Sequence, residues 1–284
     1  MQVKKVGVLG AGTMGQGIAQ VCAEAGLNVV IVDIDQQIVD KAIQSITGNW
    51  DKALQKGKKS EEDIQKYKGL LSGAATNSSF SDCQIVIEAI VENIKIKQTV
   101  FKELDDICAP DAILASNTSA LSITEIASVT KRADKVVGVH FFNPVPAMKL
   151  IEIVPGAETD PAIVAQMVEF SKFIGKEPIP VKESPGFIVN RLLIPYINEA
   201  AIIYGEGVAS AEEIDTAMKL GANMPIGPLA LADLIGIDVC LMIMDYFWQE
   251  TGDSKYRPAL AMKTKVRANA LGRKSGKGFF NYGK

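Results

Sequence analysis

The sequence lacks the features that mark several large classes of protein. Its four cysteines have no C-x-x-C spacing, which argues against a zinc site or a disulfide framework and favours reduced thiols. The net charge is only −3 and no stretch predicts a broad basic surface, so we expect no nucleic-acid partner. Hydrophobic residues make up 48% of the 284 residues, which is enough for a well-buried core and for two domains.

A long apolar segment free of charge is missing too. The most apolar segment, residues 228–248, contains three aspartates. Each would cost about 2.5 to 3.5 kcal/mol at the centre of a bilayer, so we expect no membrane span and interpret the segment as one core or interface helix. The first apolar run begins close to Met1, with no signal peptide or Arg-rich presequence before it, so we expect a cytoplasmic protein.

The most informative stretch that is present is KKVGVLGAGTMGQGIAQ, at the start of the chain. An apolar run that predicts a buried strand is followed by Gly10, Gly12 and Gly15. In a dinucleotide-binding turn the first glycine permits the tight turn, the second lets backbone approach a pyrophosphate, and the third lets the next helix pack against the sheet. The phosphates would lie at the N-terminus of that helix, beside Thr13 and Met14.

A second apolar run, NVVIVDID, carries Asp33 where such folds place a ribose-binding carboxylate. The charge of Asp33 would repel the 2′-phosphate of NADP, so the pattern favours NAD as the cofactor. In the alternative interpretation, Asp33 only ends a strand and Asp35 caps the next helix. The order of strand, glycines and carboxylate favours the cofactor site.

Apolar runs and helical patterns then alternate as in a doubly wound sheet. We predict strands within residues 84–90, 112–118, 136–142 and 149–154, and helices near residues 36–55, 94–107 and 161–173. After Ser184 the strand alternation ends and the spacing becomes helical. We therefore predict an α/β fold, with a Rossmann-like dinucleotide-binding domain at residues 1–184 and an all-helical domain at residues 185–284.

Polar residues follow several predicted strands, at the edge where ligands of such sheets bind. Each alone could be a turn or cap residue, and Asn-Thr-Ser before an apolar helix is a common N-cap arrangement. Such positions are nevertheless the first candidates for a site. They are Glu88, Glu92, Asn117, Thr118, Ser119, His140 and Asn143.

His140 stands out because it is the only histidine of the chain and ends a predicted strand beside the expected cofactor. An ordinary imidazole pKa near 6.5 suits proton exchange at neutral pH. Glu152, which we expect at the end of the neighbouring strand, could hold the imidazole and stabilise its charged form, as the acid of a catalytic triad does. A surface ion pair remains the alternative for Glu152.

Six segments together resemble the L-3-hydroxyacyl-CoA dehydrogenase family: EAIVENIKIK, LASNTSALSITEIA, HFFNPVPAMKLIEI, PGFIVNRLLIPYINEA, DTAMKLGANMPIGPL and GRKSGKGFFNY. The resemblance spans essentially the whole chain and is especially close to bacterial 3-hydroxybutyryl-CoA dehydrogenases. It implies NAD(H)-dependent interconversion of (S)-3-hydroxybutyryl-CoA and acetoacetyl-CoA, in butyrate or fatty-acid metabolism. It also implies a homodimer formed through the helical domain.

The resemblance assigns roles to particular residues. The catalytic histidine falls on His140 and its partner on Glu152, while the substrate-binding serine and asparagine fall on Ser119 and Asn190. Because Asn190 belongs to the helical domain, we expect the site to assemble across the two domains. Further cofactor contacts are implied at Ala89, Glu92, Lys97, Asn117, Ser119, Asn143 and Lys274.

Some of these implied contacts have ordinary alternatives. Lys97 could equally be a solvated helix residue, and Asn143 precedes Pro144, where a turn role is expected. Lys52 and Lys56 match the family's coenzyme-A-binding helix, but a solvated charge run would look the same. The alternative enzyme is a dehydrogenase of a free hydroxy acid such as L-gulonate, which would keep the catalytic residues and need no site for a nucleotide tail.

Overall fold

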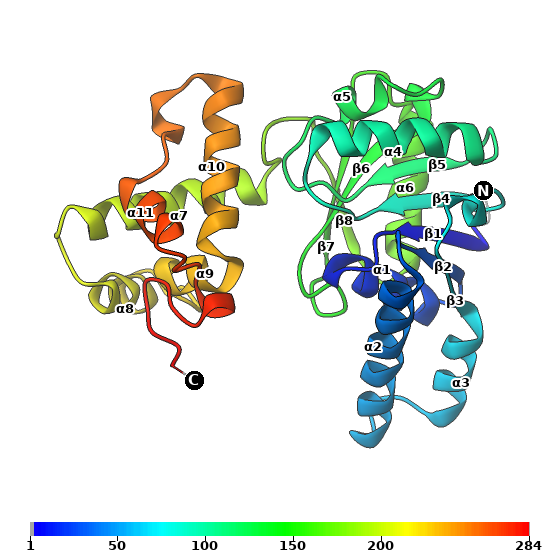
Figure 1. Ribbon diagram of the computed structural model, residues 1–284, viewed down its shortest axis with the longest axis horizontal. Helices are drawn as coiled ribbons and strands as arrows, with labels where there is room; N and C mark the ends of the chain where they lie inside the picture. Colours follow the sequence, from blue (N-terminus) through cyan, green and yellow to red (C-terminus); the bar gives the residue numbers. More distant parts are fainter. Residues whose placement is uncertain (1–2, 284) are drawn as a thin grey trace. The chain divides into compact units, whose positions relative to one another are not determined.

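The chain divides into two compact units, Met1–Ser184 and Pro185–Lys284, in a computed structural model that describes residues 3–283 (Figure 1). The first unit contains one eight-stranded sheet with the order β3-β2-β1-β4-β5-β6-β7-β8. All neighbouring strands are parallel except β6 and β7. The strands are β1 Lys5–Leu9, β2 Asn28–Val32, β3 Leu71–Ala74, β4 Ile85–Glu88, β5 Ile113–Ser116, β6 Val136–Phe141, β7 Leu150–Pro155 and β8 Glu177–Pro180. The predicted fold class is confirmed.

The helices of the first unit begin where side chains can satisfy the backbone N–H groups of a first turn. Asp35 accepts a hydrogen bond from Gln37 N at the start of α2, and Asn93 accepts from two backbone N–H groups of α4. The predicted helices at residues 36–55, 94–107 and 161–173 are confirmed. The helices are α1 Thr13–Glu24, α2 Gln36–Gln55, α3 Glu61–Leu70, α4 Ile94–Ile107, α5 Ile123–Ala127 and α6 Pro161–Phe173, with short 3-10 turns η1 Asn77–Phe80 and η2 Ala133–Lys135.

Three elements of this unit were not predicted, and each has a weak sequence pattern. The strands β3 and β8 are the two edges of the sheet, where one side is unpaired and the demand for apolar residues is lower. Their sequences, LSGA and EPIP, accordingly contain few large apolar residues. Helix α3 is polar on most of its surface and begins with a capping box between Ser60 and Asp63. Figure 1 shows α2 and α3 side by side, extending away from the sheet.

The largest hydrophobic core of the first unit lies between the sheet and helices α1, α2 and α6. Ile18 of α1, Ile46 of α2 and Met167 of α6 are fully buried there, against strand residues such as Val8 and Ile31. The central strands β4 and β5 are buried along their whole length, as expected for parallel strands covered on both faces.

The second unit is helical, apart from isolated bridges at residues 272–281. Its elements are α7 Val189–Gly205, α8 Ala211–Gly221, α9 Pro228–Ile235, α10 Ile237–Thr251, η3 Ser254–Tyr256, α11 Leu260–Arg267 and η4 Arg273–Ser275. The prediction of one helix over residues 228–248 is wrong, because Gly236 adopts a φ of 108° and separates α9 from α10. None of the helices in the described residues is long and apolar enough to cross a membrane.

Two buried aspartates accept backbone hydrogen bonds at the two ends of α9. Asp215 accepts hydrogen bonds from the N–H groups of Leu229 and Ala230, which satisfies the first turn of α9. Asp233, near the end of α9, accepts from the N–H groups of Phe279 and Phe280. Asp215 of α8 therefore stabilises the start of α9, and Asp233, which lies in the apolar segment, holds the C-terminal tail against α9.

Candidate active site

The glycine turn after β1 lines a groove of about 920 Å³ in the first unit. This volume is within the range of small-molecule and cofactor sites. The groove brings together six of the predicted cofactor residues, namely Gly10, Gly12, Thr13, Met14, Asp33 and Ala89. It is also lined by residues that the sequence did not indicate, among them Ile34, Thr76, Asn77, Val91 and Ile96.

The three glycines of the turn meet different surroundings. Gly10 has a φ of 104°, and a Cβ on it would lie 2.6 Å from the carbonyl oxygen of Ala89. A Cβ on Gly15 would lie 1.7 Å from the carbonyl oxygen of Gly10, so the turn itself needs both glycines. A Cβ on Gly12 would meet no atom within 4 Å. Gly12 is also the N-cap of α1 and provides no side-chain cap, so this open helix N-terminus fits a pyrophosphate.

The Asp33 carboxylate is fixed at the end of β2 by two backbone donors. Its Oδ2 accepts a hydrogen bond from Ala11 N at 2.7 Å, and its Oδ1 accepts from Ile34 N at 2.8 Å. Each carboxylate oxygen can accept more than one hydrogen bond, so Asp33 can also accept from ribose hydroxyls. The alternative role for Asp35 is correct as well, since Asp35 caps α2. Both aspartates therefore have a place, one in the groove and one at the helix.

An apolar rim next to Asp33 was missed from the sequence. Ile34 and Val91 are 92% and 62% exposed, and both line the groove. Exposed aliphatic side chains beside such a carboxylate could pack against the flat, apolar face of an aromatic ring. The position of Ile34, directly after Asp33, was the one signal available in the sequence.

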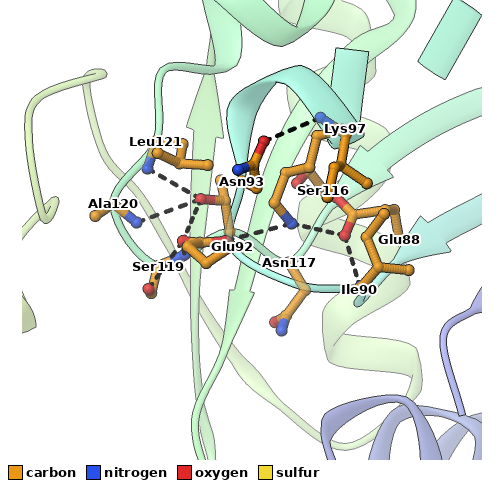
Figure 2. A network of polar contacts seen from close by, with 12 residues as sticks. Glu88, Ile90, Glu92, Asn93, Lys97, Ser116, Asn117, Ser119, Ala120 and Leu121 are labelled. Atoms are coloured by element: carbon orange, nitrogen blue, oxygen red, sulfur yellow. Dashed lines mark hydrogen bonds and ion pairs between the residues drawn. The ribbon is translucent and has the colours of Figure 1, made fainter. Parts of the chain in front are cut away.

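A buried network of charges lies between β4, α4 and β5 (Figure 2). Lys97 Nζ is 2.6 Å from Glu88 Oε1 and 3.3 Å from Glu92 Oε2. Glu88 also accepts hydrogen bonds from Ile90 N at 2.7 Å and from the Ser116 hydroxyl at 2.7 Å. The alternative of a solvated Lys97 is wrong, because its side chain is only 1% exposed. The network fixes the loop after β4 to α4 and to the end of β5.

Glu92 extends this network to Ser119, as Figure 2 shows. Its Oε1 accepts hydrogen bonds from the Thr118 hydroxyl at 2.7 Å, from Ser119 N at 2.8 Å and from the Ser119 hydroxyl at 3.0 Å. Burial alone would raise the pKa of Glu92, but the Lys97 ammonium and these hydrogen bonds outweigh burial and hold the pKa below its ordinary value. An ionised Glu92 therefore holds the loop that carries Ser119.

The N-cap interpretation of Asn117-Thr118-Ser119 is not what the structure shows. The cap of α5 is Ser122, whose hydroxyl accepts from Glu125 N. Thr118 instead stabilises the turn before the helix by accepting from Leu121 N. The Asn117 side chain accepts from Phe141 N at 2.8 Å, which ties the end of β5 to β6. These contacts set the loop of Ser119 beside the strand of His140.

His140 and Glu152 lie directly opposite each other on the antiparallel strands β6 and β7. Residues paired in this way point to the same face of a sheet. His140 Nδ1 is 2.7 Å from Glu152 Oε2, and the two side chains are 7% and 1% exposed. The expectation that Glu152 ends its strand is wrong, since it is the third residue of β7, and its burial also excludes the surface ion pair. The centroids of the Phe142 ring and the His140 imidazole are 4.3 Å apart.

The remaining predicted residues lie elsewhere in the fold. Asn143 follows β6 and is exposed, while Lys52 and Lys56 are exposed at the C-terminal end of α2. Asn190 lies in the first turn of α7 and Lys274 in η4, both in the second unit. Lys274 Nζ is 2.6 Å from Asp238 Oδ1. Among residues 3–283, no group of three or more His, Cys, Asp or Glu side chains could hold a metal ion.

Comparison with known proteins identifies the family. Residues 5–184 match the model of the 3-hydroxyacyl-CoA dehydrogenase NAD-binding domain, and residues 186–282 match the model of the C-terminal domain of the same family. A 3-hydroxybutyryl-CoA dehydrogenase of Clostridioides difficile is 51% identical over 99% of this chain and all of its own. The human mitochondrial hydroxyacyl-coenzyme A dehydrogenase is 43% identical over 99% of this chain and 91% of its own.

Solved structures agree with the sequence matches. The crystal structure of (S)-3-hydroxybutyryl-CoA dehydrogenase from Ralstonia eutropha superposes with a TM-score of 0.97, at 48% identity, over all of both chains. Matches of this extent cover both units and the whole groove. The chain belongs to the 3-hydroxyacyl-CoA dehydrogenase family of NAD-dependent oxidoreductases.

Proposed function

We propose that the protein interconverts (S)-3-hydroxybutyryl-CoA and acetoacetyl-CoA, with NAD(H) bound in the groove beside Asp33. The observation that carries the proposal is the buried contact of 2.7 Å between His140 Nδ1 and Glu152 Oε2. The strand of His140, β6, pairs with β5, which leads into the Ser119 loop. The names of the similar proteins from Clostridioides difficile and Ralstonia eutropha support the short acyl chain and the (S) configuration. A role in butyrate or fatty-acid metabolism is part of the same proposal.

His140 is the proton carrier of the proposed reaction. The bound nicotinamide supplies the hydride acceptor or donor. Since Glu152 lies against Nδ1, the proton of the substrate 3-hydroxyl passes to Nε2 during oxidation and returns from Nε2 during reduction. Glu152 favours the imidazolium that forms and orients the ring. General acid-base help of this kind contributes about 10² to 10⁴ in rate.

Ser119 and Asn190 would orient the substrate oxygens. The Ser119 hydroxyl contacts Glu92, so its direction is set before substrate binds. A hydroxyl fixed in this way loses little freedom when it bonds the substrate, which is the advantage of a preorganised site. Asn190 has the same proposed role from the second unit. The cofactor contacts of Lys97, Asn117, Asn143 and Lys274 remain proposals too, and Lys97 would act through Glu92.

The coenzyme A tail carries phosphates, and Lys52 and Lys56 are the proposed contacts. Both side chains are exposed at the end of α2, a helix whose partner α3 is held close by Lys68 and Asp51 at 2.9 Å. Exposed ammonium groups on a fixed hairpin can bind phosphates without a large desolvation cost.

A homodimer through the second unit is proposed as well. A hollow of about 700 Å³ lies along α7 and α11 and includes Leu260, which is 70% exposed. Exposed apolar side chains beside such a hollow suit a second copy of the chain. Leu260→Glu should therefore lower the mass measured by light scattering from that of a dimer to that of a monomer.

Four buried, free cysteines support a cytoplasmic location, since reduced thiols are usual there.

The test of the activity is the initial rate of NADH oxidation with acetoacetyl-CoA, run beside acetoacetyl-pantetheine and free acetoacetate. We expect rapid turnover of the CoA ester and its loss in His140→Ala. Lys52→Ala combined with Lys56→Ala should raise KM for the CoA ester and leave KM for the pantetheine ester unchanged. Lys41→Ala, an exposed lysine of the same helix, is the matched control.

The outcomes separate the proposed substrate from its alternative. If neither thioester is turned over and NAD is reduced with L-gulonate, the protein oxidises a free hydroxy acid. If His140→Ala is as active as the wild type, the proposed proton carrier is wrong. If Lys41→Ala raises KM as much as the double variant does, the phosphate site does not lie at the end of α2.

A further inference from the structure

A buried lysine outside the groove lies against the connection between the strands of His140 and Glu152. Lys176, between α6 and β8, is only 6% exposed. Its ammonium donates hydrogen bonds to the carbonyl oxygens of Val145 and Met148, at 2.5 and 2.8 Å. Both carbonyls belong to the connection that joins β6 to β7. The ammonium therefore holds the two ends of one short turn.

The same turn is held from its other side by α1. The backbone of the turn is closed by hydrogen bonds from the N–H groups of Ala147 and Met148 to the Pro144 carbonyl, both at 3.0 Å. Val145 is 2% exposed and packs where α1 carries Gly17. A Cβ on Gly17 would lie 2.7 Å from the Cβ of Val145, so the helix allows no shift of the turn toward it. The turn is thus enclosed between α1 and Lys176.

Placing a charged side chain at position 176 carries a large desolvation cost. Burial lowers the pKa of Lys176, and the nearby Glu24 and Cys22 offset only part of that effect. A buried ammonium bonded to carbonyls costs more free energy than a well-packed apolar side chain would. It supplies what an apolar side chain cannot, which is directional bonds to two carbonyls three residues apart in one turn.

We propose that Lys176 is a positioning residue for the reaction. By holding the turn of residues 144–148, it fixes the offset between β6 and β7, and this offset sets the contact of His140 Nδ1 with Glu152. Asn143, immediately before the turn, is placed by the same contacts. The proposed effect on turnover depends on the proposed function, whereas the effect on the imidazole does not.

The test uses Lys176→Met in the full-length protein, with any histidine tag removed. Methionine keeps the length of the side chain and loses the donors. Lys172→Met is the matched control, because Lys172 lies on α6, is 58% exposed and pairs only with surface Glu169 at 3.0 Å among the ion pairs of the described residues. The chain has one histidine, so its imidazole gives a single set of ¹⁵N signals by NMR.

We expect Lys176→Met to shift or broaden the His140 Nδ1 signal and to lower kcat by about 10-fold to 10²-fold, with KM for acetoacetyl-CoA changed much less. Lys172→Met should change none of these quantities. If Lys176→Met lowers only Tm and leaves the imidazole signals and kcat at the values of the control, Lys176 is merely stabilising and the proposal is wrong.

Two further arrangements keep the test decisive. If Lys176→Met does not fold, Gly17→Ala crowds the same turn from α1 and should shift the same imidazole signal, while an unchanged signal in Gly17→Ala contradicts the proposal. If the wild type does not turn over acetoacetyl-CoA, the proposed function fails. A shifted imidazole signal in Lys176→Met would in that case still support the positioning role.

Discussion

Replacing Lys97 by methionine should destabilise the first unit strongly, because the change removes the only ammonium of the network that binds Glu88. The side chains of Lys97 and Glu88 are 1% and 0% exposed, so water cannot take the place of the lost partner. Glu92 loses its ion-pair partner at the same time. The variant would therefore contain two carboxylates close together, one of them fully buried.

The magnitude follows from the burial and the remaining hydrogen bonds. Breaking a buried ion pair by removing one partner typically costs about 3 to 5 kcal/mol. Glu88 keeps its bonds from Ile90 N and from the Ser116 hydroxyl, so we take the lower end. At roughly 2 to 4 °C per kcal/mol for a unit of this size, a loss of about 3 kcal/mol lowers Tm by about 6 to 12 °C.

The assay is thermal unfolding followed by circular dichroism at pH 7. The matched control is Lys95→Met, which removes an exposed lysine from the first turn of the same helix. The double variant Lys97→Met with Glu88→Gln should recover part of the lost Tm, because a neutral amide replaces the unpaired carboxylate. A Tm of Lys97→Met within about 2 °C of the Lys95→Met value would refute the reasoning, since about 1 kcal/mol or less would then separate a buried and an exposed lysine.

Three further predictions concern the site and the core. Glu152→Gln should lower kcat by about 10² or more and leave NAD binding intact, because the imidazolium loses its partner, whereas Glu158→Gln, an exposed residue after β7, should keep wild-type rates in the NADH assay. Gly12→Ala should keep the wild-type Tm, since its Cβ meets no protein atom, and should weaken NAD binding measured by calorimetry. Gly15→Ala should lower Tm, and equal Tm losses in the two variants would contradict this assignment of the turn. Burial raises the pKa of Cys22 and Cys240 to about 12, so the native protein should not react with a thiol reagent at pH 8 and the unfolded protein should expose four thiols. Since the folded pKa lies above the ordinary value of 9.0, the stability that these thiols contribute is complete below pH 9.0 and decreases as the pH rises toward 12.

The parts of the fold that could be predicted are those decided by local sequence. The helices α2, α4 and α6 begin at side chains that cap them, namely Asp35, Asn93 and Asp160, and their bounds match the prediction. The edge strands β3 and β8 escaped prediction because an edge strand needs fewer apolar residues. The break at Gly236 escaped it because the apolar pattern continues across this glycine, whose φ of 108° is visible only in the structure.

The candidate site also contains residues that the sequence could predict and residues that it could not. The glycine turn and Asp33 have fixed spacing in the sequence, so the groove could be located before its walls were known. The environment of Lys97 could not be predicted, since it depends on the packing of α4 against β4 and the loop after it. The pairing of His140 with Glu152 lies between these cases. The residues could be named, but the antiparallel register that places them opposite each other became visible only in the sheet.

Two buried lysines now appear as related solutions to one physical problem. Ser119 lies on a loop and Asn143 at the start of a turn, where no strand ladder holds the backbone, and His140 lies near the end of β6 that leads into this turn. Lys97 fixes the loops after β4 and β5 through carboxylates, and Lys176 fixes the turn after β6 through carbonyls. A displacement of about 1 Å at a reacting group can cost about 10²-fold in rate, so directional bonds from a buried ammonium are worth their desolvation cost at these positions. The proposed role of Lys176 follows the same logic as the observed network of Lys97, because in each case a buried ammonium fixes a loop or turn next to a residue proposed for the site.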